Sequence, residues 1–225
     1  TFFPAERELT SVMAAFAAFA AGFLMRPIGA ILIGYIGDHY GRKQALALSI
    51  LLMGAPALII ALLPGHASWG VTATIIMVLA RMLQGLSAGG EFNGAAIFVI
   101  EHNKKGRKAF LSSFVSCAGG IGALGAMLCG AVISQPYMPE WAWRLPFAFG
   151  SLIAIVGYFL RQYLDESPEF KKAQQTSKDE EGLFELLKNN LYPIALVFSV
   201  GAMDGTLAYM LVGFINVYLI KFVGL

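Results

Sequence analysis

The fold is decided by a stretch that reads Gly34-Tyr-Ile-Gly37-Asp38-His-Tyr-Gly41-Arg42-Lys43-Gln-Ala-Leu46. This short charged turn separates two long segments with almost no charge, Leu9–Ile36 before it and Ala45–Leu63 after it. Glycines allow the backbone to reverse sharply and let neighbouring helices approach closely. The stretch therefore predicts two apolar helices joined by a tight, basic turn.

The rest of the chain repeats this alternation of apolar runs and polar turns. Of its 225 residues, 57% are hydrophobic and 13% are charged, and the mean hydropathy is +0.68, which is more apolar surface than a water-soluble fold can hide. A helix of roughly 20 apolar residues crosses a bilayer, and a barrel strand would instead alternate apolar and polar positions. The continuous runs predict an all-α membrane protein with six spans near Leu9–Ile36, Ala45–Leu63, Val71–Ile100, Phe110–Ser134, Leu145–Leu160 and Leu191–Ile220.

The basic residues predict the orientation of these spans. The loop after the first span carries Arg42 and Lys43, and the loop after the third carries four more cations, whereas the loops at Gly65 and at 135–142 carry none. Loops rich in Lys and Arg remain in the cytoplasm. With six spans, both ends of the chain are then expected outside.

Three regions are predicted along the chain. Residues 1–161 form a bundle of five spans, residues 162–190 form a central cytoplasmic loop of mixed charge, and residues 191–225 begin a second block. Within the loop, residues 183–188 are expected either as a short interfacial helix or as a disordered connector. Because this layout is lopsided, the chain is expected to be part of something longer.

The charged turn resembles the signature loop of the major facilitator superfamily, Gly-x-x-x-Asp-x-x-Gly-Arg-Arg/Lys. Asp38, Gly41, Arg42 and Lys43 match it position by position, and the turn lies between two predicted spans on the basic side. An ordinary basic turn is the plainer interpretation. A phosphate-binding loop is excluded, because no Ser or Thr follows Lys43. The resemblance implies that Gly34 and these four residues form a cytoplasmic gating motif.

The third span carries a second unusual run, Arg81-Met-Leu-Gln84-Gly85-Leu-Ser87-Ala88-Gly89-Gly90-Glu91-Phe-Asn93-Gly94. Its three-four spacing predicts that Arg81, Gln84 and Glu91 share one inward face. Charges within a membrane are costly and normally face a cavity, so they are candidates for function. The alternative is a structural ion pair that fixes helix packing.

Arg26 and Asp204 are the other charges expected within the membrane. Arg26 and Glu91 both lie roughly 15 Å from the cytoplasmic ends of their helices by residue count. They are predicted either to pair, or to act separately with Arg26 toward a substrate and Glu91 toward a proton. Asp204 is expected to be a coupling or substrate residue, or to form a hydrogen bond between helices.

The second run also resembles the metabolite/proton symporter branch of the superfamily, together with Trp141-Ala-Trp143-Arg144-Leu-Pro146-Phe and Asp165-Glu166-Ser167-Pro168-Glu-Phe170. The similarity extends from about Phe2 to Leu225 and is strongest to the proline/betaine type. It implies spans two to seven of twelve, alternating access, and a bacterial inner (plasma) membrane location. Carboxylic acids such as citrate and 2-oxoglutarate are equally open as substrates, and the choice of proton over sodium rests on the resemblance.

The predicted function is secondary active transport, by proton-coupled symport of a small organic acid or a zwitterionic osmolyte. The partners are a small-molecule substrate, protons and the lipid bilayer, with no nucleic acid. The alternatives are a non-transporting sensor and an inactive truncated product. No enzyme, cofactor or metal site is expected: Gly120, Gly122 and Gly125 match a nucleotide-binding pattern, but no strand precedes them. The predicted substrate and proton pathway comprises Arg26, Arg81, Gln84, Glu91, Asn93 and Asp204.

Overall fold

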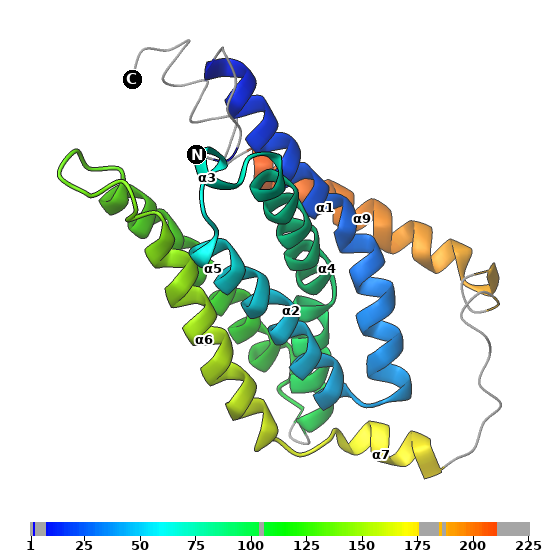
Figure 1. The fold of residues 1–225 in the computed structure, drawn as a ribbon. Coiled ribbons are helices and arrows are strands. Elements are labelled where there is room, and N and C mark those ends of the chain that lie inside the picture. The colour runs from blue at the N-terminus through cyan, green and yellow to red at the C-terminus, as the bar shows by residue number, and fades with distance from the viewer. Residues whose placement is uncertain (1, 3–7, 104–105, 176–184, 186–187, 211–225) are drawn as a thin grey trace. The chain divides into compact units, whose positions relative to one another are not determined.

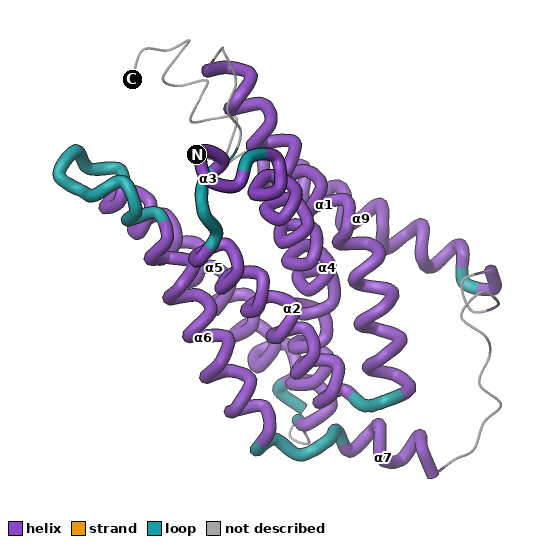
Figure 2. The backbone as a smooth tube through the Cα atoms, viewed as in Figure 1, coloured by secondary structure: helices purple, strands orange, loops and turns teal. Residues whose placement is uncertain are grey.

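A computed structural model describes residues 2, 8–103, 106–175, 185 and 188–210 of the chain. The chain forms two units, Thr1–Ser177 and Lys178–Leu225, and each is described by itself. Figure 2 shows the described residues as helices joined by short loops, with no strand among them. The predicted all-helical membrane fold is confirmed.

The first unit contains seven described helices, and five of them are long and apolar enough to cross a membrane. These five are α1 (Glu8–His39), α2 (Arg42–Leu62), α4 (Val71–His102), α5 (Lys108–Ile133) and α6 (Arg144–Gln162). Two short helices, α3 (His66–Trp69) and α7 (Pro168–Gln175), were not predicted. The second unit contains α9 (Leu191–Tyr209), an apolar helix where the sixth span is predicted; residues 211–220 of that span lie outside the described residues.

Helix α4 is at the centre of the first unit. It packs against α1 along most of its length and also against α2, while α2 packs against α6 (Figure 1). Lipid tails are as apolar as the helices, so close contact between small residues is what favours packing in a membrane. The sequence supplies such residues on each of these helices.

Glycines bring the backbones of α1 and α4 into direct contact. A methyl group added at Gly22 would lie 2.9 Å from the carbonyl oxygen of Arg81. A methyl group at Gly29 would overlap the carbonyl of Leu86, and one at Gly89 would overlap the carbonyl of Arg26. The two helices therefore form one closely packed pair, and the candidate charges of both helices lie beside it.

Helices α2 and α6 also pack closely at glycines, here against side chains of the partner helix. The methyl group of Ala154 fills the space beside Gly54, and the side chain of Ile50 covers Gly157. At the far end of this pair, Arg144 at the start of α6 donates a 2.9 Å hydrogen bond to the carbonyl of Leu63, the C-cap residue of α2. This bond satisfies a carbonyl that the helix itself leaves unpaired.

A buried apolar cluster closes the end of the unit that the charge pattern predicts to be extracellular. Partly buried side chains pack against it, among them Trp143, which makes an edge-to-face contact with the ring of Phe2 at 5.3 Å. The cluster places the aromatic rings of α6 next to the first half of α4. Its buried members are Phe2, Ile60, Leu63, Ala73, Met77 and Ala80.

The start of helix α7 is explained by residues that can be recognised in the sequence. Ser167 caps it, because its hydroxyl accepts a 3.1 Å hydrogen bond from the backbone N–H of Phe170. Pro168 occupies the first helical position, where no N–H is needed, and Glu169 lies in the first turn. The predicted loop thus begins with a helix, whereas residues 183, 184, 186 and 187 of the predicted interfacial helix lie outside the described residues.

Candidate functional site

Arg81 is a half-buried cation near mid-depth of the predicted membrane. It lies ten residues after the start of α4, about 15 Å along the axis, which is half of a ~30 Å hydrocarbon core. Its guanidinium donates a 3.2 Å hydrogen bond to the side-chain oxygen of Gln84 and lies 5.1 Å from the centre of the Phe147 ring. Among the described residues no carboxylate pairs with it. Its charge is therefore oriented, and no described carboxylate neutralises it.

Arg26, like Arg81, pairs with no carboxylate in the described part of the chain. Its side chain is exposed on α1 and stacks over the ring of Phe23 at 3.8 Å. Gly22, one turn before it, lies against the carbonyl of Arg81, so the two arginines are about one helical turn apart in level. An exposed cation at this depth needs water or another polar surface, because lipid cannot solvate it.

Glu91 pairs with Arg161 of α6, and not with Arg26 as one of the two hypotheses held. The carboxylate oxygen Oε1 lies 2.8 Å from Nη2 of Arg161, and the two side chains are only 25% and 18% exposed. Arg161 was not among the predicted residues. It is the penultimate residue of an apolar helix, where a cation is expected at the membrane surface anyway, so its sequence position gave no special signal.

The Glu91–Arg161 pair is tied to α2 as well. The Nη1 atom of Arg161 donates to the carbonyl of Leu46 and lies 3.4 Å from the hydroxyl of Ser49. One turn before Glu91, the fully buried hydroxyl of Ser87 donates a 2.6 Å hydrogen bond to the carbonyl of Ser49. Three helices thus share one polar network of charged and neutral groups.

The neighbours of Glu91 place it near one end of α2 and α6. Leu46 is four residues from the start of α2, about 6 Å, and Arg161 is one residue from the end of α6. Counting along α4 alone gave roughly 15 Å, because α4 extends beyond the other two helices. The carboxylate therefore lies closer to the predicted cytoplasmic surface than its own helix suggests.

The predicted gating motif forms a connected charged cluster at this same end. Arg42 pairs with Asp38 at 2.7 Å and contacts Glu101 of α4 at 3.4 Å. The turn between α1 and α2 uses Gly41 with a φ of 115°, a conformation that favours glycine. Asp38 therefore holds the arginine of its own motif, while Glu101 adds a contact that the sequence did not reveal.

Glu166 anchors the start of α2 from the segment that follows α6. Its carboxylate accepts hydrogen bonds of 3.2 Å from the backbone N–H of Lys43, a first-turn group with no partner inside its helix. The ammonium group of Lys43 donates a 2.7 Å hydrogen bond to the carbonyl of Gln162. These bonds hold the end of α6 against the beginning of α2.

Asn93 and Gly34 line a small cavity of about 140 Å³ between α1, α2 and α4, together with Arg42. Asn93 is itself exposed. The space is large enough for a few water molecules and has polar groups to hold them. Asp204 lies in α9 of the second unit, so its role in a pathway stays a prediction.

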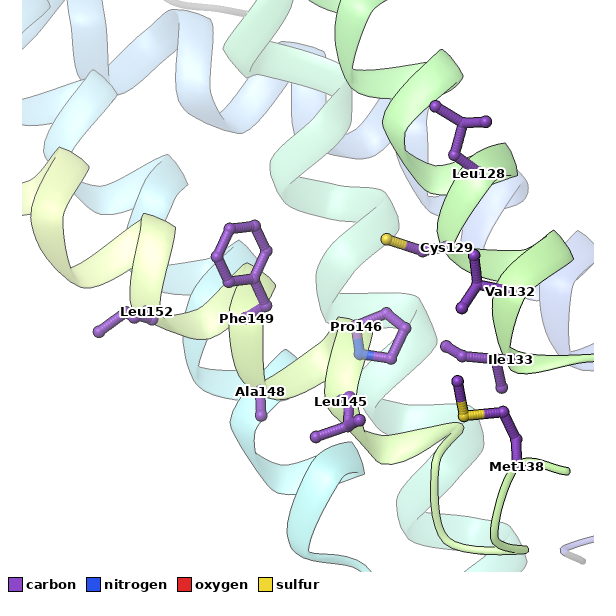
Figure 3. Close-up of a pocket in the computed structure, with 10 residues that line it drawn as sticks. All are labelled: Leu128, Cys129, Val132, Ile133, Met138, Leu145, Pro146, Ala148, Phe149 and Leu152. Atoms are coloured by element: carbon purple, nitrogen blue, oxygen red, sulfur yellow. The ribbon is translucent and has the colours of Figure 1, made fainter.

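A pocket of about 680 Å³ between α5 and α6 is apolar (Figure 3). It contains none of the predicted site residues, and its side chains offer no charge or amide to orient a polar ligand. Among the described residues no group of three or more His, Cys, Asp or Glu side chains is placed to hold a metal ion. The polar chemistry is concentrated along α4 and at the predicted cytoplasmic end.

The arrangement of helices matches solved membrane transporters. It is similar to the Escherichia coli xylose transporter XylE in a partially occluded inward-open conformation, with a TM-score of 0.67, 19% identity, and coverage of 100% of this chain and 57% of that chain. XylE bound to 6-bromo-6-deoxy-D-glucose gives a TM-score of 0.66 at 19% identity, over 75% of this chain and 38% of that chain. The fold is a major facilitator-type helical bundle.

The sequence gives the family. Residues 3–214 match the family described as "Sugar (and other) transporter", and the chain belongs to it. It is 36% identical to an alpha-ketoglutarate permease of Escherichia coli K12 over 100% of this chain and 52% of the relative. It is 36% identical to a citrate-proton symporter of Salmonella typhi (97% and 50%) and 38% identical to a proline/betaine transporter of Salmonella typhimurium LT2 (80% and 37%).

These findings fix the class of protein. It is a multi-pass inner-membrane protein of a transporter family, and its relatives are transporters rather than enzymes. The resemblance to the major facilitator superfamily and its proton-symporter members is confirmed. The chain spans about half the length of the first relatives it matches.

Proposed function

We propose that the protein imports a small carboxylate-bearing metabolite, an organic acid or a zwitterion, together with protons. The observation that carries the proposal is Arg81, a cation held by Gln84 and Phe147 near the middle of the membrane with no carboxylate partner among the described residues. A buried charge without a counter-charge is costly. A carboxylate substrate would supply the missing partner.

The printed names of the relatives agree with this chemistry. 2-Oxoglutarate, citrate, proline and betaine differ in size and net charge, but each carries a carboxylate. Guanidinium groups bind carboxylates through paired hydrogen bonds, so one arginine suits all four. Arg26, one turn away and also without a described carboxylate partner, is proposed to attract the same group as it enters.

Protons are proposed to enter the cycle at a carboxylate, Glu91 or Asp204. Glu91 has the geometry in its favour, because its carboxylate is part-buried, paired, and near the predicted cytoplasmic ends of two helices. The cluster of Asp38, Arg42 and Glu101 is proposed to close the cytoplasmic side by changing partners between states. Alternating access of two helical halves would then move the substrate.

Glu91→Gln tests the proton role. In cells expressing the complete reading frame that contains this chain, the variant is expected to lose gradient-driven accumulation and to keep substrate exchange without a gradient. Gln cannot release a proton, and Arg161 keeps its bond to α2 and can extend toward water, so the fold is expected to survive.

The matched control is Glu140→Gln, an exposed carboxylate in the loop before α6. It should accumulate and exchange substrate like the unchanged protein. If Glu91→Gln also accumulates and exchanges substrate normally, then Glu91 does not carry the proton and Asp204 becomes the candidate.

A further inference from the structure

Arg161 of α6 has no role in the proposed transport cycle so far, and its guanidinium contacts both α2 and α4. It donates to Glu91 on α4 and to the carbonyl of Leu46 on α2 while belonging to α6. Its charge is matched one to one by Glu91, and both side chains are mostly buried. A charge-assisted pair of this kind is stronger than a neutral hydrogen bond and depends on both partners being ionised.

We propose that Arg161 is the positioning residue of the coupling carboxylate, so that binding of a proton to Glu91 unfastens α4 from α6. This rests on the proposed symport function. In the ionised state Glu91 is fixed by Arg161, and α4 is bound to the other two helices. When Glu91 takes up a proton, the ion pair becomes a weaker hydrogen bond between the guanidinium and a neutral carboxyl group, while Arg161 keeps its bond to α2.

The surroundings of Glu91 favour Arg161 as the group that governs protonation. On α2 the polar groups that contact Arg161 are the Ser49 hydroxyl and the Leu46 carbonyl, and neither carries a charge. On the other side of α4, the neighbour from α1 is Ile33, packed against Gly90.

Two cations of the neighbouring turn between α1 and α2 have partners of their own. Arg42 is bound to Asp38 and Glu101, and the ammonium of Lys43 is bound to the carbonyl of Gln162. Gln162 directly follows Arg161, so a displacement of Arg161 would be transmitted to the Lys43 contact and hence to the start of α2. The proton site and the gating motif are thereby connected through two consecutive residues of α6.

The proposal is tested with Arg161→Gln, Arg161→Lys and the double variant Glu91→Gln/Arg161→Gln in the complete reading frame. Gradient-driven uptake is measured from acid to alkaline pH, and exchange without a gradient is measured alongside. Arg161→Gln removes the positive charge that pairs with Glu91. The half-maximal pH of Arg161→Gln should therefore move upward by about one unit or more, whereas Arg161→Lys keeps the charge and should move less.

If Arg161 has only a structural role, a different result is expected. Uptake by Arg161→Gln would then fall by the same factor at every pH, with no shift of the half-maximal pH, and that outcome overturns the proposal. Arg161→Gln leaves the charge of Glu91 without its partner, whereas the double variant leaves neither charge of the pair. The exchange rate of the double variant should therefore differ from that of Arg161→Gln and approach that of Glu91→Gln alone. If exchange by the double variant instead falls below that of both single variants, the pairing has no functional role.

Thermal melting in detergent separates this inference from the proposed function. The melting-temperature loss of the double variant should be smaller than the sum of the two single losses, since both single variants break the same pair. Additive losses would show that the pair is not formed. If the unchanged protein accumulates no substrate under any gradient, the proposed symport fails, while non-additive melting would still establish the pair itself.

Discussion

Arg81→Gln is expected to raise the KM for a carboxylate substrate roughly 10- to 100-fold, the range for loss of a hydrogen bond to a charged group. The reason is that Arg81 is an oriented cation near mid-membrane that no described carboxylate neutralises, and Gln supplies no charge. The measurement is the concentration dependence of exchange in cells expressing the complete reading frame. Melting of the purified protein establishes that the variant is folded.

Two control variants sharpen this prediction. Arg81→Lys keeps the charge but loses the planar fork, so its KM should lie between those of Arg81→Gln and the unchanged protein. Arg144→Gln removes an arginine that caps α2 through the carbonyl of Leu63, so it should lower the melting temperature without a change in KM. An unchanged KM for Arg81→Gln would remove Arg81 from the substrate site.

Gly29→Ala is expected to destabilise the bundle by about 3 kcal/mol, the upper range for overpacking a closely fitted interior. The added methyl group would overlap the backbone carbonyl of Leu86, and backbone cannot rotate away as a side chain does. Because α1 and α4 are in contact over most of their length, the two helices would have to separate. The expected result is a lower melting temperature in detergent and less folded protein in the membrane.

Gly34→Ala is the matched control on the same helix. A methyl group at Gly34 meets no described atom within 4 Å, and alanine is the better helix former by roughly 0.5–1 kcal/mol. Its melting temperature should equal or exceed that of the unchanged protein. If Gly29→Ala melts at the same temperature as Gly34→Ala, the close contact of α1 with α4 does not stabilise the fold.

The membrane spans could be predicted because a long, continuous run of apolar residues is what allows a helix to cross a bilayer. The second span was predicted at Ala45–Leu63, and α2 extends over Arg42–Leu62. The difference at the start is informative: the basic residues of the turn are part of the helix, where Glu166 satisfies the N–H of Lys43. A pattern of hydrophobicity alone does not contain that partner, which lies 123 residues away in the sequence.

The sequence predicted which charged residues lie within the membrane, but it did not predict which residue forms the ion pair with Glu91. The sequence indicated that Arg26, Arg81 and Glu91 are charges within the membrane. It did not indicate Arg161 as the partner of Glu91, because distance from a helix end gives depth and not the direction a side chain takes around the axis. Helix α7 could have been predicted, since the serine, proline and glutamate at 167–169 are a typical helix start.

The most direct test of the central claim is uptake of labelled proline, glycine betaine, citrate and 2-oxoglutarate by cells expressing the complete reading frame. Each substrate is supplied with and without an imposed proton gradient. The proposal predicts that at least one of the four accumulates only when the gradient is present. If the protein reaches the membrane and none accumulates under either condition, the proposed carboxylate–proton symport is contradicted.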